Sequence, residues 1–560
     1  MGTRRARGLL VAGMILAMLL VGRLFYIQVM GHEDLSKAAV GQYIVPIEGL
    51  DCRGIIYDRN MVPLTGGTTQ YFYIVPAERM DSNLSSLLSC LDARKVGGRQ
   101  GQYQVYRTET FDQVLNERLI QQYNSYGFRC AGRYSDNQIA AHIIGYINSD
   151  EQKGVAGIEL MKDDILTGID RSLCLYGDSK GNILKGFEIT TSIVSSGVDI
   201  EGQGADGVTN HTLKPNTVVT TIDSRIQALA ERILDQRKVH GSVVVLKTKT
   251  GEILACASTP AFNPNKLDEH LGNMGDELIN KATQGVYSPG SVFKIIVAAA
   301  ALDSTLCDEK KTFECKGHVT INGVTLKCET GGDAGHGTIN MAQALAQSCN
   351  CYFAQLGQLL GSEKIIEMAQ KMGLGKATIV GFPEESSGVL PEYSERIYSG
   401  LSNLSIGQGT LGVTPMQVAR FTNIIANDGL DTGVHLIAGE AEKSLQVWGH
   451  SPMPGQGEAG EIMEPVVSLK TSTTIRTMME DVMSEGTGKS AITYAPCGGK
   501  TGSAEASISG VKVIHGWFTG YFPAENPMYT ITVFVEKGGS GSGSALPIFT
   551  QIVNGCSDIL

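Results

Sequence analysis

The chain has 560 residues, of which 42% are hydrophobic and 18% are charged, and its formal net charge is −11. This composition is typical of folded globular proteins, and the length allows two to four domains. The negative balance argues against a nucleic-acid partner, because phosphate binding requires clustered Lys and Arg.

The N-terminus predicts a membrane anchor. Three arginines within residues 1–7 precede the run Gly8–Val29, whose 22 residues carry a single charge, Arg23, near the far end. A bilayer core of about 30 Å needs about 20 apolar residues, and an arginine near the end can reach the interface. Basic residues ahead of the span keep the N-terminus cytoplasmic. We therefore expect a cytoplasmic tail (1–7), a single transmembrane helix (8–30) in the cell membrane and an extracytoplasmic remainder. A cleaved signal peptide is the alternative.

Two further domains are predicted after the anchor. Residues 31–215 alternate short strand-like stretches with irregular connections, and the segment before residue 216 is rich in Gly, Ser, Asn and Asp, as linkers are. We therefore predict an elongated, strand-rich pedestal or dimerisation-like domain with a linker (31–215), followed by a second domain (216–560).

The second domain is predicted to be α+β, with an antiparallel sheet flanked by helices. A strand and an amphipathic helix, capped by Asp223 or Ser224, precede a hairpin whose tip is Lys249-Thr250-Gly251. Two strand-like runs near the C-terminus precede a last apolar segment, expected to be a helix that packs on the sheet. The apolar helices expected in between are Ser291–Leu302, Met341–Leu360 and Pro415–Ala426.

The chain has 12 cysteines, scattered from Cys52 to Cys556. Cys315 and Cys328 flank two short strands and a turn at Asn322-Gly323, so they could form a disulfide bridge if the geometry allows. A C-x-C spacing such as Cys349-Asn350-Cys351 lacks the paired partner that a zinc site would need. Most of the cysteines are expected to act as small buried hydrophobic residues.

Ser291 and Lys294 are candidates for a nucleophile and its base. They stand three residues apart after Pro289-Gly290 and before an apolar run, so both would lie on one face at the start of a helix. The helix N-terminus would also stabilise an oxyanion near Ser291. Ser509 and Lys512 repeat the spacing in a strand-like stretch, where residues three apart point to opposite faces.

Two downstream elements complete a known signature. S-x-x-K, an S-x-N-type element and K-T-G together are typical of penicillin-binding proteins and class A β-lactamases. Ser348-Cys349-Asn350 and Lys500-Thr501-Gly502 follow Ser291 in the required order. Ser135-Asp136-Asn137 and the K-T-G at Lys249 are second copies with the wrong order or local structure.

The chain resembles class B (monofunctional) penicillin-binding proteins over nearly its whole length. Beyond the ordered triple, "GVYSPGSVFK", "SNLSIGQGTLGVTPMQVA" and "HGWFTGYFP" look like transpeptidase landmarks, and "RGIIYDRN" and "GVAGIELMKDDILTG" look like the pedestal. Two departures are Cys349, where relatives often carry other residues, and Ser503, where threonine is common.

The resemblance implies a peptidoglycan D,D-transpeptidase that is acylated by β-lactams. Ser291 would attack the penultimate carbonyl of a stem peptide that ends in D-Ala-D-Ala, and an amine from a neighbouring stem peptide would then take the acyl group. Lys294 would be the base, because burial and the charge of Lys500 lower its pKa. Ser348 would shuttle the proton, and Asn350 would hold Lys294 and the substrate amide.

The K-T-G strand would bind the substrate. Lys500, Thr501 and Ser503 would bind the terminal carboxylate, and Gly502 would let an extended peptide lie against the strand. The backbone N–H groups of Ser291 and Ser503 would form the oxyanion hole. No metal or cofactor is expected.

Four other polar or aromatic residues near these motifs are interpreted as structural. His515 and Trp517 are expected to pack beneath the site, and Asp58 and Arg59 to form a pair in the pedestal.

Alternatives stay open at this stage. A D,D-carboxypeptidase or a β-lactamase would use the same serine, and a wall-synthesis scaffold would keep the site incidentally. The pedestal suggests a glycosyltransferase of the SEDS family and other wall-synthesis proteins as partners. The sequence does not distinguish a role in elongation, division or sporulation.

Overall fold

The computed structural model describes most of the chain in two compact units. The described residues are 2–26, 44–47, 53–76, 79–99, 103–108, 110–123, 125–148, 153–167, 171–176, 190–193, 217–271, 275–441, 465–508, 510–557 and 559. The first unit comprises Met1–Cys52, Thr68–Gly132 and Ile169–His211, and the second comprises Arg53–Gly67, Arg133–Gly168 and Thr212–Leu560.

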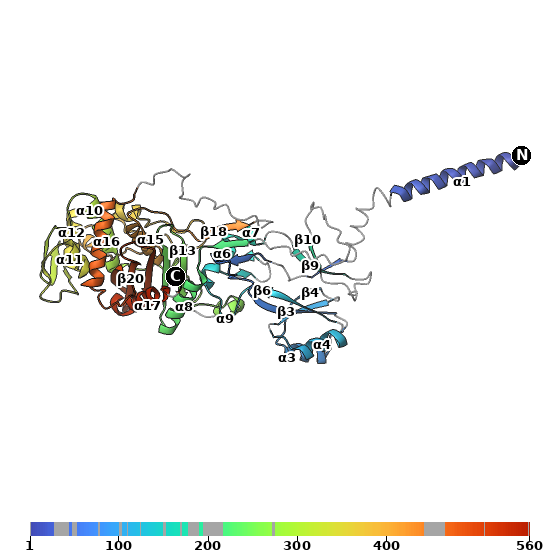
Figure 1. Ribbon diagram of the computed structural model, residues 1–560, viewed down its shortest axis with the longest axis horizontal. Helices are drawn as coiled ribbons and strands as arrows, with labels where there is room; N and C mark the ends of the chain where they lie inside the picture. Colours follow the sequence, from blue (N-terminus) through green and yellow to red (C-terminus); the bar gives the residue numbers. More distant parts are fainter. Residues whose placement is uncertain are drawn as a thin grey trace. The chain divides into compact units, whose positions relative to one another are not determined.

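The first unit contains a four-stranded antiparallel sheet with the order β4-β5-β3-β6. Helices α3 and α4 lie together beside these strands in Figure 1, and buried Leu84, Leu88 and Leu119 pack against Tyr73 and Val75. A three-stranded sheet, β1-β9-β10, belongs to the same unit. The bounds are β1 Ile44–Ile47, β3 Thr68–Pro76, α3 Ser82–Cys90, β4 Arg94–Arg99, β5 Tyr103–Thr108, α4 Gln113–Tyr123, β6 Tyr126–Gly132, β9 Arg171–Tyr176 and β10 Thr190–Ile193.

The N-terminal helix α1 extends over Gly2–Phe25. Its described apolar side chains are exposed, among them Leu10, Met18 and Leu19. No helix in the described part of the chain meets the length and hydropathy needed to cross a membrane.

Two pedestal segments belong to the second unit, where a buried ionic network joins them. The Glu159 carboxylate is inaccessible to solvent and accepts hydrogen bonds from Arg53 Nε (2.6 Å), Arg133 Nε (2.6 Å) and the Tyr134 hydroxyl (2.9 Å). A buried carboxylate persists only when it is paired in this way. The predicted boundary near residue 215 lies outside the described residues and stays a prediction.

The same segments hydrogen-bond to the C-terminal part of this unit. Strand β2 (Ile55–Tyr57) pairs in parallel with β11 (Thr217–Thr220), which pairs on its other edge with β18 (Ile437–Ala441). The short elements that follow β6 are α5 Ala141–Ile144, β7 Ile147–Asn148, β8 Lys153–Gly154, α6 Gly157–Met161 and α7 Asp163–Thr167.

Asp58 and Arg59 are structural, as predicted, but they do not form a pair with each other. Asp58 accepts from the main-chain N–H of Asn60 (2.7 Å) and from the Ser224 hydroxyl (2.7 Å). The Arg59 guanidinium forms an ion pair with Glu252 (3.3 Å). The two residues begin a tight turn after β2, in which the Met61 N–H donates to the Asp58 carbonyl (3.1 Å), and each side chain has its own partner.

The core of the second unit is a five-stranded antiparallel sheet with the order β13-β12-β21-β20-β19. The predicted hairpin is confirmed as β12 and β13, and the two C-terminal strand-like runs lie in β20 and β21. The bounds are β12 Gly241–Lys247, β13 Ile253–Thr259, β19 Gly498–Ile508, β20 Val511–Phe522 and β21 Tyr529–Val535.

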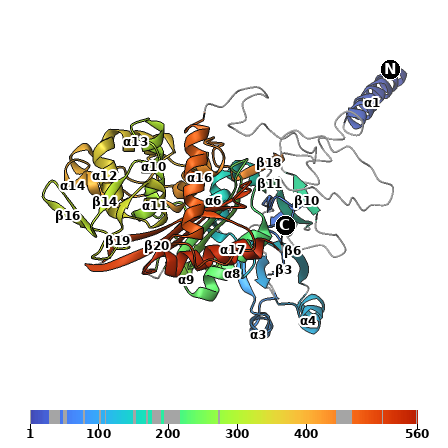
Figure 2. The same ribbon diagram turned by 60° about the vertical axis from the view of Figure 1, so that its left-hand side comes forward.

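Helices cover both faces of this sheet, which confirms the predicted α+β arrangement (Figure 2). The alternation along β20 shows the two layers, since side chains of a strand point to opposite faces in turn. Trp517 and Tyr521 enter the larger core with α10–α16, whereas Phe518 and Phe522 pack on α8 and α17. The last apolar segment is α17, as predicted, and Phe518 and Phe549 have ring centroids 4.4 Å apart.

The remaining elements of the second unit are mostly short. Asp223 is the N-cap of α8, and its side chain accepts from the Arg225 N–H. The bounds are α8 Ser224–Arg237, η3 Pro264–Lys266, α9 Leu267–Leu271, η4 Gly290–Phe293, α10 Lys294–Asp303, β14 Phe313–Cys315, β15 His318–Ile321, β16 Val324–Lys327, β17 Gly337–Ile339, α11 Met341–Ala346, α12 Asn350–Leu360, α13 Ser362–Lys371, η5 Tyr393–Glu395, α14 Ser399–Leu404, α15 Pro415–Ala426, α16 Leu469–Ser484, η6 Gly541–Ala545 and α17 Leu546–Cys556.

One segment that was predicted as a single helix is interrupted in the structure. The segment Met341–Leu360 forms two helices, α11 and α12, because Ser348 adopts a left-handed conformation with φ 56° and Cys349 is extended. A non-glycine residue in that region ends a helix and is common at functional sites. The predicted helix Pro415–Ala426 is confirmed as α15.

Candidate active site

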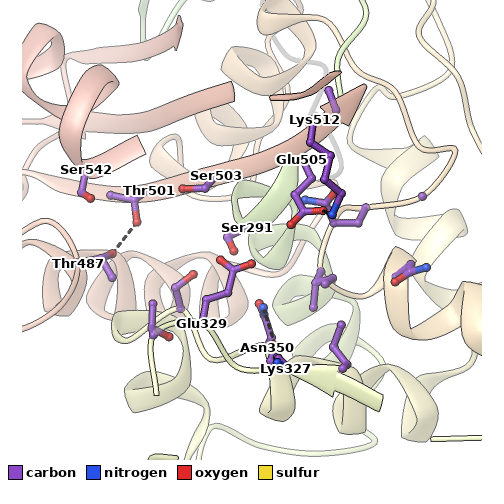
Figure 3. Close-up of a pocket in the computed structure, with 18 of the residues that line it drawn as sticks. Ser291, Lys327, Glu329, Asn350, Thr487, Thr501, Ser503, Glu505, Lys512 and Ser542 are labelled. Carbon is purple, nitrogen blue, oxygen red and sulfur yellow. Dashed lines mark hydrogen bonds and ion pairs between the residues drawn. The ribbon is translucent and has the colours of Figure 1, made fainter. Parts of the chain in front are cut away.

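A cavity of 670 Å³ gathers residues from all three sequence elements (Figure 3). Ser291, Ser348, Asn350, Thr501 and Ser503 all line it. These side chains come from η4, from the break between α11 and α12, and from β19. Three motifs that are far apart in the sequence therefore contribute to one site.

Ser291 lies in a 3₁₀ turn, η4, that leads directly into α10. The turn begins at Gly290, which has φ +56° and whose N–H donates to the Gly407 carbonyl (2.8 Å). A Cβ at Gly290 would lie 2.5 Å from the Ser503 carbonyl oxygen. Glycine therefore allows both the left-handed backbone and the close approach of the turn to β19.

Lys294 is fully buried below the cavity. Its Nζ donates to the Ser348 carbonyl (2.8 Å) and Asn350 Oδ1 (2.7 Å), and lies 3.4 Å from Ser348 Oγ and 5.5 Å from the Phe353 ring centroid. Burial disfavours the ammonium and lowers the pKa of Lys294 to about 8. These contacts hold a cation that is unusually ready to release its proton.

Lys500 is also buried, at the start of the K-T-G stretch on β19. Its Nζ donates to the Thr501 carbonyl (2.9 Å), and burial together with the charge of Lys294 lowers its pKa. The hydroxyl groups of Thr501 and Thr487 are 2.6 Å apart, on the side of the cavity that also carries Ser542 (Figure 3). This side suits an anion.

Gly502 has a different role from the one predicted. A Cβ there would lie 2.9 Å from Val292 Cγ1, 3.1 Å from Trp517 Cβ and 3.2 Å from the Pro289 carbonyl oxygen. The position faces the protein interior, so the missing side chain lets β19 pack against the turn that holds Ser291. The absent side chain therefore does not make room for the substrate, contrary to the prediction.

His515 and Trp517 are buried in β20, in agreement with the predicted packing role. The Trp517 indole N–H donates to the Ser288 carbonyl (3.0 Å), and the His515 ring accepts from the Lys537 N–H (3.2 Å). Trp517 thereby supports the segment immediately before Ser291.

Several cavity residues carry no motif that could have identified them. Thr487 follows α16, Glu329 follows the β15–β16 hairpin, and Glu505 and Lys512 form an ion pair (3.3 Å) between β19 and β20. Thr487 and Glu329 reach the site only through the fold, whereas the β19–β20 hairpin brings Glu505 and Lys512 there. A sequence pattern of short range carries no signal for such residues.

Four potential metal ligands adjoin the S-x-N motif. The sulfur atoms of Cys315, Cys328 and Cys349 and a ring nitrogen of His336 all lie within 4.8 Å of one another. The Cys328 sulfur is 3.7 Å from Cys349 Sγ and 3.6 Å from His336 Nδ1. Tetrahedral zinc with Zn–S near 2.3 Å and Zn–N near 2.0 Å would require ligand separations of about 3.5–3.8 Å.

This cluster supplies the partners that the C-x-C spacing lacks in the sequence. The expected partner pair is missing close in sequence, but the fold supplies Cys349 with partners from the β14–β17 region. The hydrogen bond between the Cys328 and Cys349 thiols lowers the pKa of Cys328 and raises the pKa of Cys349. Cys315 and Cys328 are free thiols here, and three cysteines with one histidine fit structural zinc.

Comparisons with known proteins agree with this site. The family model described as the penicillin binding protein transpeptidase domain matches residues 241–554, more than half of the chain. The peptidoglycan D,D-transpeptidase MrdA of Acinetobacter baumannii is 27% identical over 614 residues, covering 97% of this chain and 87% of its own. Stage V sporulation protein D of Bacillus subtilis is 27% identical over 560 residues, covering 95% and 82%.

Solved structures show the same fold. A chain from a study of polymerisation and crosslinking by a peptidoglycan synthase complex has a TM-score of 0.71 at 24% identity, over 100% of this chain and 99% of that one. The penicillin-binding protein PBP2 of Helicobacter pylori, in complex with MreC, has a TM-score of 0.68 at 19% identity, over 92% and 98%.

The chain belongs to the penicillin-binding protein transpeptidase family. Its relatives are of the class B type, and the enzyme type predicted from the sequence, a serine-dependent peptidoglycan D,D-transpeptidase, is confirmed at this level. The roles of individual residues stay predictions.

Proposed function

We propose that this chain cross-links peptidoglycan stem peptides through an acyl-enzyme on Ser291. Ser291 Oγ bonds to the penultimate carbonyl carbon of a D-Ala-D-Ala terminus, and the amide bond to the last D-Ala breaks. The observation that carries this proposal is the cavity itself, which collects Ser291, Ser348, Asn350 and Thr501 from separate elements.

Lys294 takes the proton of Ser291 in this mechanism. A general base must be unprotonated, and burial favours the neutral amine of Lys294. Asn350 Oδ1 and the Ser348 carbonyl fix the position of its Nζ. Ser348 Oγ, 3.4 Å from that nitrogen, passes the proton on to the leaving D-Ala amine. The same groups carry a proton again during acyl transfer, this time from the acceptor amine back to Ser291 Oγ.

The terminal carboxylate binds on the K-T-G side of the cavity. Lys500 supplies a buried positive potential, and the hydroxyls of Thr501 and Ser503 line the space above it. Thr487 orients the Thr501 hydroxyl through their contact. The main-chain N–H groups of Ser291 and Ser503 form the oxyanion hole, which stabilises the tetrahedral intermediate.

Residues 8–30 anchor the chain in the cell membrane, with residues 1–7 in the cytoplasm and the catalytic domain outside. Support comes from the arginines before the apolar run and from the exposed apolar side chains of α1. The test is membrane fractionation with an alkaline carbonate wash. The full chain should stay in the membrane pellet, and release into the wash would contradict the anchor.

A glycosyltransferase of the SEDS family that makes the glycan strand is the proposed partner. One of the similar structures belongs to a peptidoglycan synthase complex and another to a complex with MreC, which supports an assembly with wall-synthesis proteins. Co-purification from membranes with a tagged full-length chain tests this partner.

The decisive reaction assay supplies a pentapeptide donor that ends in D-Ala-D-Ala together with an amine acceptor. We expect release of D-Ala and an amide-linked product, both lost in Ser291→Ala. Release of D-Ala with hydrolysed donor and no amide-linked product would instead identify a carboxypeptidase.

A further inference from the structure

The two walls of the cavity differ in their charge and in their partners. The wall formed by β19 carries the hydroxyls of Thr501 and Ser503 above buried Lys500, and Glu505 on the same strand is neutralised by Lys512 at 3.3 Å. The opposite wall carries Glu329. In Figure 3 the Glu329 carboxylate points toward Ser291.

Glu329 has no ion pair or side-chain hydrogen bond with any residue of the described chain, and it is exposed to the cavity. Its charge acts at longer range on buried Lys294, whose pKa it raises against the larger, lowering effect of burial. Lys327 lines the same wall, and its main-chain carbonyl accepts from Asn350 Nδ2 (3.3 Å). A free carboxylate in a reaction site attracts a cation. The Glu329 carboxylate would repel the terminal carboxylate of the donor peptide, so it does not favour donor binding.

Three contacts hold the two residues before Glu329 beside the catalytic motif. Two residues before Glu329, the Lys327 carbonyl accepts a hydrogen bond from Asn350 Nδ2. One residue before Glu329, the Cys328 sulfur lies 3.7 Å from Cys349 Sγ. The Cys328 N–H also donates to the Gly317 carbonyl (2.8 Å) at the base of the hairpin. The position of Glu329 relative to Asn350 is therefore set by packing rather than by a mobile loop tip.

We propose that Glu329 binds the ammonium group of the acyl acceptor, and so determines that the acyl-enzyme passes to a cationic amine rather than to water. This proposal rests on the proposed function. The ammonium releases one proton to solvent, its nitrogen bonds to the acyl carbon, and the bond from that carbon to Ser291 Oγ breaks. The second proton moves to Ser291 Oγ, so that an amide and the free serine result.

The test measures how the acyl-enzyme divides between acceptors. Full-length protein is acylated at pH 7 by a D-alanyl thioester donor, and transfer and hydrolysis products are quantified by mass spectrometry. Glycinamide serves as a largely cationic acceptor, and hydroxylamine as an uncharged one. Glu329→Gln should lower the transfer-to-hydrolysis ratio for glycinamide about tenfold and leave the ratio for hydroxylamine unchanged, because one charge–charge attraction is lost.

Glu314→Gln is the matched control, since Glu314 is an exposed glutamate of the neighbouring strand β14 outside the cavity, where it pairs with Lys316 (3.2 Å). It should leave both ratios unchanged. An unchanged ratio for glycinamide in Glu329→Gln, or an equal fall for both acceptors, would overturn the proposal. Acylation by a fluorescent penicillin is measured in parallel, and its absence in the wild type would instead refute the proposed function.

Discussion

Lys294 carries the pH dependence of the proposed mechanism. The ordinary lysine pKa is near 10.4, and burial lowers that of Lys294 to about 8 by disfavouring its charge. The neutral fraction of Lys294 therefore rises with pH through this region, whereas an unperturbed lysine would stay protonated. The charge of Lys294 in turn contributes, after burial, to the lowered pKa of the neighbouring Lys500.

We expect the rate of acylation by penicillin to increase from pH 6 to pH 9 with an apparent pKa of about 8. Lys294→Arg, which stays charged, should lower the rate by about 10²–10⁴-fold, the usual contribution of a general base. Stopped-flow measurement of acylation gives both results. Lys249→Arg, at the exposed hairpin tip, is the control, and a flat profile for the wild type would exclude Lys294 as the base.

At the scale of elements, the site depends on how closely β19 packs against η4. Gly290 and Gly502 lie on the two sides of this contact, and each would clash if it gained a Cβ. Gly502→Ala should destabilise the fold by about 1–3 kcal/mol, as overpacking does, and slow acylation by displacing Ser503 from Ser291. Thermal unfolding and penicillin labelling measure the two effects.

The control for this substitution is Gly67→Ala, because a Cβ at Gly67 would meet no atom within 4 Å. Its unfolding temperature and labelling rate should match those of the wild type. Equal behaviour of the Gly502 and Gly67 variants would show that the approach of β19 to η4 is not limiting.

The cysteine and histidine cluster joins the hairpin region to the break that positions Ser348 and Asn350. We expect purified protein to contain about one zinc per chain, and Cys315→Ser or His336→Ala to lower that content strongly. Chelation should lower the unfolding temperature, because a bound metal stabilises the folded state. Metal analysis measures the content, with buried Cys497→Ser as the control. A wild-type protein without metal, and insensitive to chelator, would contradict this assignment.

The sequence predicted the elements whose signals are local. The β12–β13 hairpin follows from two apolar runs around a turn, and α15 from its apolar run; the structure adds a capping box at Thr414 and Gln417. The break at Ser348 could not be predicted, because serine has no strong local preference for the left-handed conformation that it adopts there. Cys328 and Cys349 likewise meet only in the fold, 21 residues apart.

At the scale of the whole molecule, the division into two units also depends on contacts between residues that are distant in the sequence. Arg53 and Glu159 are separated by 106 residues, and their pairing brings two pedestal segments into the second unit. No short-range pattern in the sequence predicts this pairing. The duplicated motifs could be distinguished from the sequence, because motif order and local structure selected the copies that line one cavity.

The rejected copies lie in other settings. Lys249 forms an ion pair with Asp428 (3.1 Å) at the hairpin tip, and Ser135 lies in the turn after β6, where its N–H donates to Gln138. Ser509 lies outside the described residues, and Lys512 is engaged by Glu505. The proposed chemistry therefore depends on Ser291.

The most direct measurement is intact mass after incubation of the full-length protein and Ser291→Ala with a fluorescent penicillin over several hours. We expect one stable adduct per chain in the wild type and none in the variant. Labelling that survives Ser291→Ala would contradict the assignment of the nucleophile, and rapid turnover without an accumulating adduct would indicate hydrolysis rather than transpeptidation.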